Sequence, residues 1–119
     1  MRARYTAASR ERRKKVLNRA KGFNGSRRYR LKTAKEALLH AMSYEYRDRR
    51  NKKRDFRRLW INRISAFVRT EGISYSRFIS GLTKAGVVIN RKIMANLAVE
   101  DPEVMKKYVE IAKKELKLG

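Results

Sequence analysis

The chain has 119 residues, which is enough for one domain but too few for two independent cores. Lys and Arg number 33 against 11 Asp and Glu, and the resulting net charge of +22 would make a compact monomer repel itself unless an anionic partner supplied countercharge. With no cysteine and His40 as its one histidine, the sequence excludes disulfides and any recognisable zinc or haem site. We therefore expect neither a metal nor a cofactor.

Charge and apolar residues are distributed unequally along the chain. Residues 1–58 contain 22 basic and 5 acidic residues but only 7 of Val, Ile, Leu and Phe. Residues 59–119 contain 11 basic and 6 acidic residues and 20 of these apolar ones. The first half therefore falls in the compositional range of chains that cannot fold alone. This predicts a basic arm over residues 1–58 and a globular helical domain over residues 59–119.

The arm is expected to begin with a tail and a short helix. Residues 1–8 show no hydrophobic periodicity, which predicts an extended tail. Ser9 is expected to cap a helix over residues 10–21, and Gly22 is a natural stop. The surface of this helix is basic apart from a small apolar stripe, which favours contact with nucleic acid.

A turn is predicted at Gly22-Phe-Asn-Gly25, where two glycines can adopt positive φ and let the backbone approach a phosphate. Phe23 in this turn has two interpretations that the sequence leaves equally open. It either packs on Val16 or Leu17 of the preceding helix, or it contacts an RNA base or ribose.

Ser26 is then expected to cap one long helix that ends at Thr70, with Gly72 as its stop. Its first part has a thin apolar stripe that could lie either on the first helix or on RNA sugars. The stripe comprises Leu31, Ala34, Leu38 and Met42, with Leu39 and Tyr46 beside it. From Arg47 to Asp55 the helix has no apolar residue, and its basic side chains point to every side. Such a segment has no face to bury in protein. The pairs Glu45–Arg49 and Asp48–Lys52 are expected to support the helix at i,i+4 spacing.

The pattern changes from Phe56 onward, where apolar residues recur at spacings of three and four. This stripe comprises Phe56, Trp60, Ile64 and Phe67, flanked by Leu59 and Val68. It predicts that the end of the long helix lies on a core. We place Trp60 in that core, with stacking of its indole on RNA as the minority alternative.

Three shorter helices are predicted to complete the domain. Ser74 caps residues 75–85 with Gly86 as the stop, Asn90 caps residues 91–99, and Asp101 with Pro102 begins the last helix. The expected core positions are Tyr75, Phe78, Ile79, Leu82, Ile93, Met94, Leu97, Met105, Tyr108, Val109, Ala112 and Leu116. Residues 87–89 are predicted to fill the core as a connector rather than to form a strand. The fold class is therefore all-α, with an extended basic arm and a long helix leading into a small C-terminal bundle.

No catalytic constellation is found in the sequence. Glu36 lies one turn before His40, but such a pairing is far more often structural than catalytic. No Ser, His and Asp trio and no phosphate-binding glycine loop can be placed, so we expect no enzyme and no small-molecule substrate. Among anionic partners, a segment that is basic all round suits structured RNA better than a flat membrane or the groove of B-DNA.

Seven short motifs resemble the bacterial family of large-subunit ribosomal protein number twenty. They are Arg12-Arg-Lys-Lys-Val-Leu17, Ala20-Lys-Gly22, Tyr46-Arg-Asp-Arg-Arg50, Lys53-Arg-Asp-Phe-Arg57, Leu59-Trp-Ile61, Ser74-Tyr-Ser-Arg-Phe78 and Asn90-Arg-Lys92. Together they cover nearly the whole chain in order, and the combination is highly specific. The first nine residues depart from the family pattern, so contacts of the extreme tail are not carried over.

The resemblance implies a structural constituent of the large ribosomal subunit on the cytoplasmic ribosome. Its implied partners are 23S rRNA and neighbouring ribosomal proteins, with a role in early subunit assembly and, in some bacteria, repression of its own operon through the mRNA leader. The alternative is a free basic regulatory or DNA-packaging protein. The residues predicted to bind RNA are Arg10, Arg12, Arg13, Lys14, Lys15, Arg19, Lys21, Arg27, Arg28, Arg30, Lys32, Arg47, Arg49, Arg50, Lys52, Lys53, Arg54, Arg57, Arg58, Arg77, Arg91 and Lys92.

Overall fold

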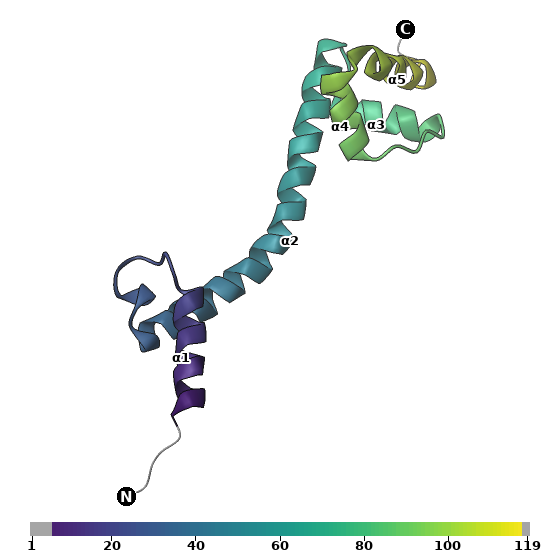
Figure 1. Cartoon of the computed structure of the whole chain (residues 1–119). Coiled ribbons are helices and arrows are strands. Elements are labelled where there is room, and N and C mark those ends of the chain that lie inside the picture. The colour runs from purple at the N-terminus through teal and green to yellow at the C-terminus, as the bar shows by residue number, and fades with distance from the viewer. Residues whose placement is uncertain (1–5, 118–119) are drawn as a thin grey trace, which may run out of the picture. The chain divides into compact units, whose positions relative to one another are not determined.

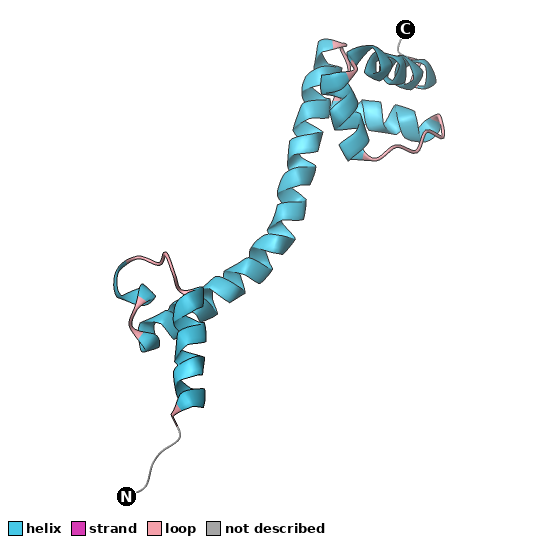
Figure 2. Ribbon diagram, in the orientation of Figure 1, coloured by secondary structure: helices cyan, strands magenta, loops and turns pink. Residues whose placement is uncertain are grey.

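The computed structural model describes residues 6–117, and their regular secondary structure is entirely helical (Figures 1 and 2). The elements in order are α1 (Ala7–Arg19), the 3₁₀-helix η1 (Gly25–Arg28), α2 (Leu31–Thr70), α3 (Tyr75–Lys84), α4 (Arg91–Glu100) and α5 (Pro102–Glu115). No strand occurs in this part of the chain, and residues 87–89 form a connector as expected. The all-α class and the long helix are confirmed. The chain divides into two compact units, Met1–Arg50 and Asn51–Gly119, and each is described by itself.

In the first unit, α1 begins three residues earlier than the predicted helix. Thr6 is the N-cap residue, although its side chain makes no capping bond, and its carbonyl accepts the Arg10 amide at 2.9 Å. The prediction for Ser9 was wrong because Ala7 and Ala8 are strong helix formers that extend the helix past it. The predicted tail is thereby corrected at these two alanines, and its residues 1–5 lie outside the described chain. Gly22 follows the helix with φ +86°, as predicted for a stop.

The start of α2 also differs from the prediction. The chain first forms η1, in which the Ser26 carbonyl accepts the Tyr29 amide, and α2 begins only at Leu31. Ser26 therefore contributes its backbone rather than a side-chain cap. Its carbonyl also accepts a hydrogen bond from the Thr33 hydroxyl at 3.2 Å, which ties the loop to the first turn of α2.

A small apolar cluster holds this unit together. Its buried members are Ala20, Ala34 and Leu38, and Val16, Leu17 and Phe23 pack against them. Phe23 packs against this cluster together with Val16 and Leu17, as the packing interpretation predicted. The predicted stripe is only partly buried, because Leu39, Met42 and Tyr46 are exposed.

The second unit is a bundle of α3, α4 and α5 around the C-terminal end of α2 (Figure 1). Its buried core comprises Ile64, Val68, Ile73, Phe78, Leu82, Met94, Ala95, Met105, Val109 and Ala112. The predicted four-helix composition of the core is confirmed. Trp60 packs against this core while remaining partly exposed, as its predicted place at the core requires.

Capping residues and glycines with positive φ account for most of the bundle's helix boundaries. Gly72 adopts φ +80°, and the Ile73 amide donates to the Val68 carbonyl at 3.1 Å, which closes α2 as predicted. The Ser74 hydroxyl accepts the Arg77 amide at 3.5 Å, and the Asn90 side chain accepts the Ile93 amide at 2.9 Å. Asp101 precedes α5 as expected, but its side chain makes no capping bond.

Four apolar residues that were placed in or beside the core lie outside it. Phe56 is 44% exposed and Leu59 is 40% exposed, because the core includes no residue of α2 before Trp60. Ile93 is 50% exposed, since Met94 and Ala95 provide the buried face of α4. Val88 is 96% exposed because extended backbone alternates its side chains, and Val87 and Ile89 take the inward positions.

The closest helix contact of the bundle lies between α3 and α5 at Gly81. A methyl group added to Gly81 would lie 2.6 Å from the carbonyl oxygen of Ala112. Glycine within a helix costs about 1 kcal/mol relative to alanine. Here the absence of a side chain permits the backbone approach that buries Ala112.

Candidate nucleic-acid interface

The predicted RNA-binding residues all lie at the molecular surface. Each is exposed except Arg91, which is half-buried. The Arg91 Nε donates a hydrogen bond to the Tyr75 hydroxyl at 2.9 Å, so this side chain helps to join α3 and α4. No charged or polar residue in the described chain is buried. The fold therefore leaves its positively charged side chains exposed to solvent.

Little of this charge is neutralised within the protein. Across residues 6–117 there are two ion pairs, Glu45–Arg49 at 3.1 Å and Arg47–Asp48 at 3.0 Å. The first was predicted, but the predicted Asp48–Lys52 pair is absent because Asp48 bonds the adjacent Arg47 instead. Both pairs are exposed to solvent and contribute little to stability. Most of the positive charge of these residues is therefore left for dissolved ions or an anionic partner to balance.

The middle of α2 has no buried face, as the sequence predicted. Between Met42 and Leu59 every residue is exposed except Asn51, which is half-buried. Helices of soluble proteins normally bury one apolar stripe. This stretch instead presents basic residues on all sides, an arrangement that fits contact with phosphates from several directions.

Exposed tyrosines lie beside these cations on α2, and the sequence analysis did not pair them with the arginines. The Arg47 guanidinium lies 4.6 Å from the centroid of the Tyr44 ring, and that of Arg50 lies 5.3 Å from the centroid of the Tyr46 ring. The Arg50 Nη2 also donates to the Tyr46 hydroxyl at 3.2 Å. The signal was present as Tyr followed three or four residues later by Arg. Such rings can stack on unpaired bases while the arginines bind phosphate.

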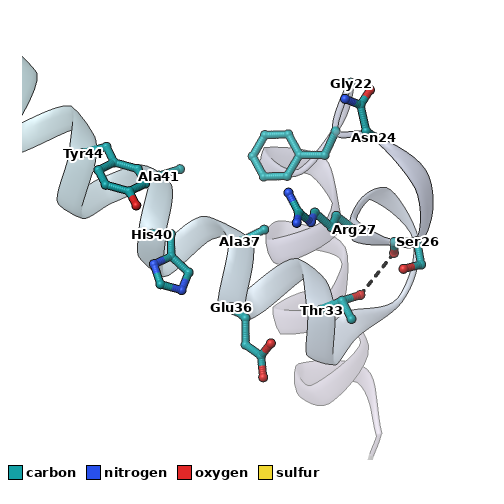
Figure 3. A pocket seen from close by; sticks show the side chains of 11 residues that line it. Gly22, Asn24, Ser26, Arg27, Thr33, Glu36, Ala37, His40, Ala41 and Tyr44 are labelled. Carbon is teal, nitrogen blue, oxygen red and sulfur yellow. Dashed lines mark hydrogen bonds between the residues drawn. The ribbon is translucent and has the colours of Figure 1, made fainter.

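A groove of about 820 Å³ lies in the first unit between the loop after α1 and one face of α2 (Figure 3). It is lined by Gly22, Phe23, Asn24, Ser26, Arg27, Thr33, Glu36, Ala37, His40, Ala41 and Tyr44. The rings of His40 and Tyr44 lie 6.3 Å apart, with 26° between their planes. Neither an ion pair nor a hydrogen bond joins His40 to Glu36 in the described structure. The groove thus combines aromatic faces, one carboxylate and one guanidinium.

Two other kinds of site were sought in the part of the chain that the structure describes. No group of three or more His, Asp or Glu side chains is arranged to hold a metal ion there. None of the helices in that part combines the length and apolar character that crossing a membrane would require.

Comparison with known proteins identifies the family of the chain. Residues 2–108 match the family described as Ribosomal protein L20. The chain is 55% identical over 104 residues to the large ribosomal subunit protein bL20 of Roseiflexus sp., covering 87% of this chain and 89% of the relative. It is 50% identical over 115 residues to the bL20 protein of Carboxydothermus hydrogenoformans, covering 97% and 98% of the two chains. The chain therefore belongs to the ribosomal protein L20 family, and as such it is a structural constituent of the large subunit of the cytoplasmic ribosome and not an enzyme.

Proposed function

We propose that the chain binds 23S rRNA directly through its basic arm, residues 1–58, and thereby supports early assembly of the large subunit. The observation that carries this proposal is the middle of α2, where exposed cations surround the helix with only two ion pairs among them. A globular partner that contacts one face would leave most of these charges unmatched. Folded rRNA, which can approach a helix from several sides, supplies phosphate to all of them.

The C-terminal bundle has a different role in this proposal. Its apolar core makes it a stable body, and its surface presents fewer candidate RNA contacts, namely Arg77, Arg91 and Lys92. The bundle would seat on the rRNA surface beside neighbouring ribosomal proteins. Because the Tyr75 hydroxyl holds the Arg91 side chain, Arg91 is preorganised and loses less side-chain entropy on binding.

Competition between RNA and DNA distinguishes this proposal from the alternative that the chain is a free DNA-packaging protein. The full chain is bound to labelled 23S rRNA at physiological salt and challenged with unlabelled 23S rRNA, with duplex DNA of equal phosphate content and with its own mRNA leader. We expect the rRNA to displace the probe at concentrations at least tenfold below those of duplex DNA, because RNA folds offer a specific shape. Equal competition by DNA would refute specific rRNA binding. Displacement by the mRNA leader would extend the proposal to autoregulation.

The arm and the bundle should differ in stability when RNA is absent. Ordering each residue costs about 1–2 kcal/mol of backbone entropy, and among residues 6–58 only the small cluster around Ala34 offsets it. Amide hydrogen exchange on the free chain should therefore give strong protection from Trp60 to Leu116 and little protection before about Asp55. Addition of rRNA should extend protection into α2. Equal protection along the whole of α2 without RNA would contradict this division of the chain.

A further inference from the structure

Glu36 is an unusual residue for the arm, because a carboxylate repels the phosphates that the surrounding cations would bind. The arm contains five acidic residues, and the structure pairs Glu45 and Asp48 with neighbouring arginines. Glu11, Glu36 and Asp55 form no such pair within residues 6–117, and of these three only Glu36 lines the groove of the first unit. A carboxylate only accepts hydrogen bonds, so a ligand of this groove must present donors to it.

The rest of the groove is suited to one nucleotide of RNA. Its volume of about 820 Å³ lies in the range of small-molecule pockets. Figure 3 shows Glu36, His40 and Tyr44 projecting from successive turns of α2, and the Arg27 side chain extending from η1 toward α2 near Ala37. The two rings offer stacking faces, and the exposed Arg27 offers charge for a phosphate.

Among the four RNA bases, guanine is the one whose Watson–Crick edge carries two adjacent donors, N1–H and the N2 amino group. A carboxylate can accept both at once in a bidentate arrangement. Adenine, cytosine and uracil each place at least one acceptor at the corresponding positions, and an acceptor would face the carboxylate without a proton between them. We propose, on the basis of the rRNA-binding function above, that this groove binds an unpaired guanosine, with Glu36 reading its Watson–Crick edge.

The test uses the full chain and short RNA hairpins that are identical except for one unpaired nucleotide. Binding is measured by fluorescence anisotropy with guanosine, inosine or adenosine at that position. The guanosine hairpin should bind about tenfold more tightly than the adenosine hairpin, which corresponds to one bidentate pair of hydrogen bonds. Inosine lacks the N2 amino group and should bind with intermediate affinity.

Two variants that remove the same charge test whether the preference for guanosine depends on Glu36. Glu36→Gln should reduce the guanosine preference to about twofold or less, because an amide presents one acceptor where two are needed. It should not weaken binding of the adenosine hairpin. Glu11→Gln removes the same charge from an exposed position on α1 that does not line the groove, and it should leave the preference intact. Circular dichroism should show both variants to be as helical as the parent, since both positions are exposed.

The outcomes separate this inference from the function on which it rests. If the hairpins bind but show no guanosine preference, or if Glu36→Gln keeps the full preference, the groove is not a guanosine site although RNA binding stands. If no hairpin binds at moderate salt and 23S rRNA also fails to bind, both proposals are wrong.

Discussion

The affinity of the chain for 23S rRNA should fall steeply as salt is raised. Each phosphate contact releases condensed counterions, so ten contacts give a slope of roughly −7 to −9 in log affinity against log salt. Raising salt fourfold would then weaken binding on the order of 10⁴-fold to 10⁵-fold. The physical reason lies in the structure, where the cations of α2 are exposed and only two are held in ion pairs. Filter binding across a series of potassium chloride concentrations measures this slope.

Two triple variants with the same change in charge identify which cations contribute to the salt dependence of rRNA binding. Replacing Lys52, Lys53 and Arg54 by Gln should make the slope shallower by about 2 to 3, because each phosphate that is no longer neutralised accounts for close to one unit. Replacing Lys106, Lys107 and Lys114 by Gln removes three exposed cations of α5 that are not predicted to bind RNA, and the slope should not change. A parent slope shallower than about −3, or equal effects of the two triple variants, would contradict binding by the arm.

Phe78→Ala should destabilise the C-terminal bundle by about 3–5 kcal/mol. The Phe78 side chain is fully buried in the core formed by all four helices of this unit, so truncation leaves a cavity that packed neighbours cannot fill. A domain of this size has a total stability of only a few kcal/mol to about 10 kcal/mol. The variant should therefore be largely unfolded under conditions in which the parent is folded.

Urea denaturation followed by tryptophan fluorescence can measure this change, because Trp60 is the only tryptophan and packs against the same core. Ile93→Ala is the matched control. Its side chain was placed in the core from the sequence but is half-exposed in the structure, so the loss should stay below about 1 kcal/mol. Comparable losses for the two variants would mean that Ile93 belongs to the buried face of α4 after all.

The helix ends were predicted from local residue types, and these predictions were only partly correct. The predicted helix stops at Gly72 and Gly86 are confirmed, because both glycines adopt positive φ. The predicted cap at Asn90 is also confirmed, because its side chain accepts a backbone amide of α4. Ser9 and Ser26 are equally good capping residues by type, yet neither caps a helix with its side chain. In the first case preceding alanines extend α1. In the second a 3₁₀ turn uses the Ser26 carbonyl before α2 can begin.

The candidate interface was predictable in its cations but not in its groove. Charge is visible in the sequence, and because the chain has few acids, its cations remain exposed wherever the helices lie. The groove depends on the loop after α1 lying beside α2, where the Thr33 hydroxyl bonds the Ser26 carbonyl and Arg27 joins His40 and Tyr44 in the lining. No spacing rule relates a loop residue to a helix face in this way.

By itself, the sequence determined the all-α class and the positions of the bundle's helices, because hydrophobic periodicity and capping residues act over a few residues. It also determined the basic character of the arm, because charge follows directly from composition. The tertiary structure decided which apolar residues are buried, for example Met94 rather than Ile93, and which acids pair with a neighbouring arginine. These outcomes depend on the helix or loop that lies beside each residue. Burial and pairing are properties of contacts between side chains in the folded chain, and a local pattern does not contain them.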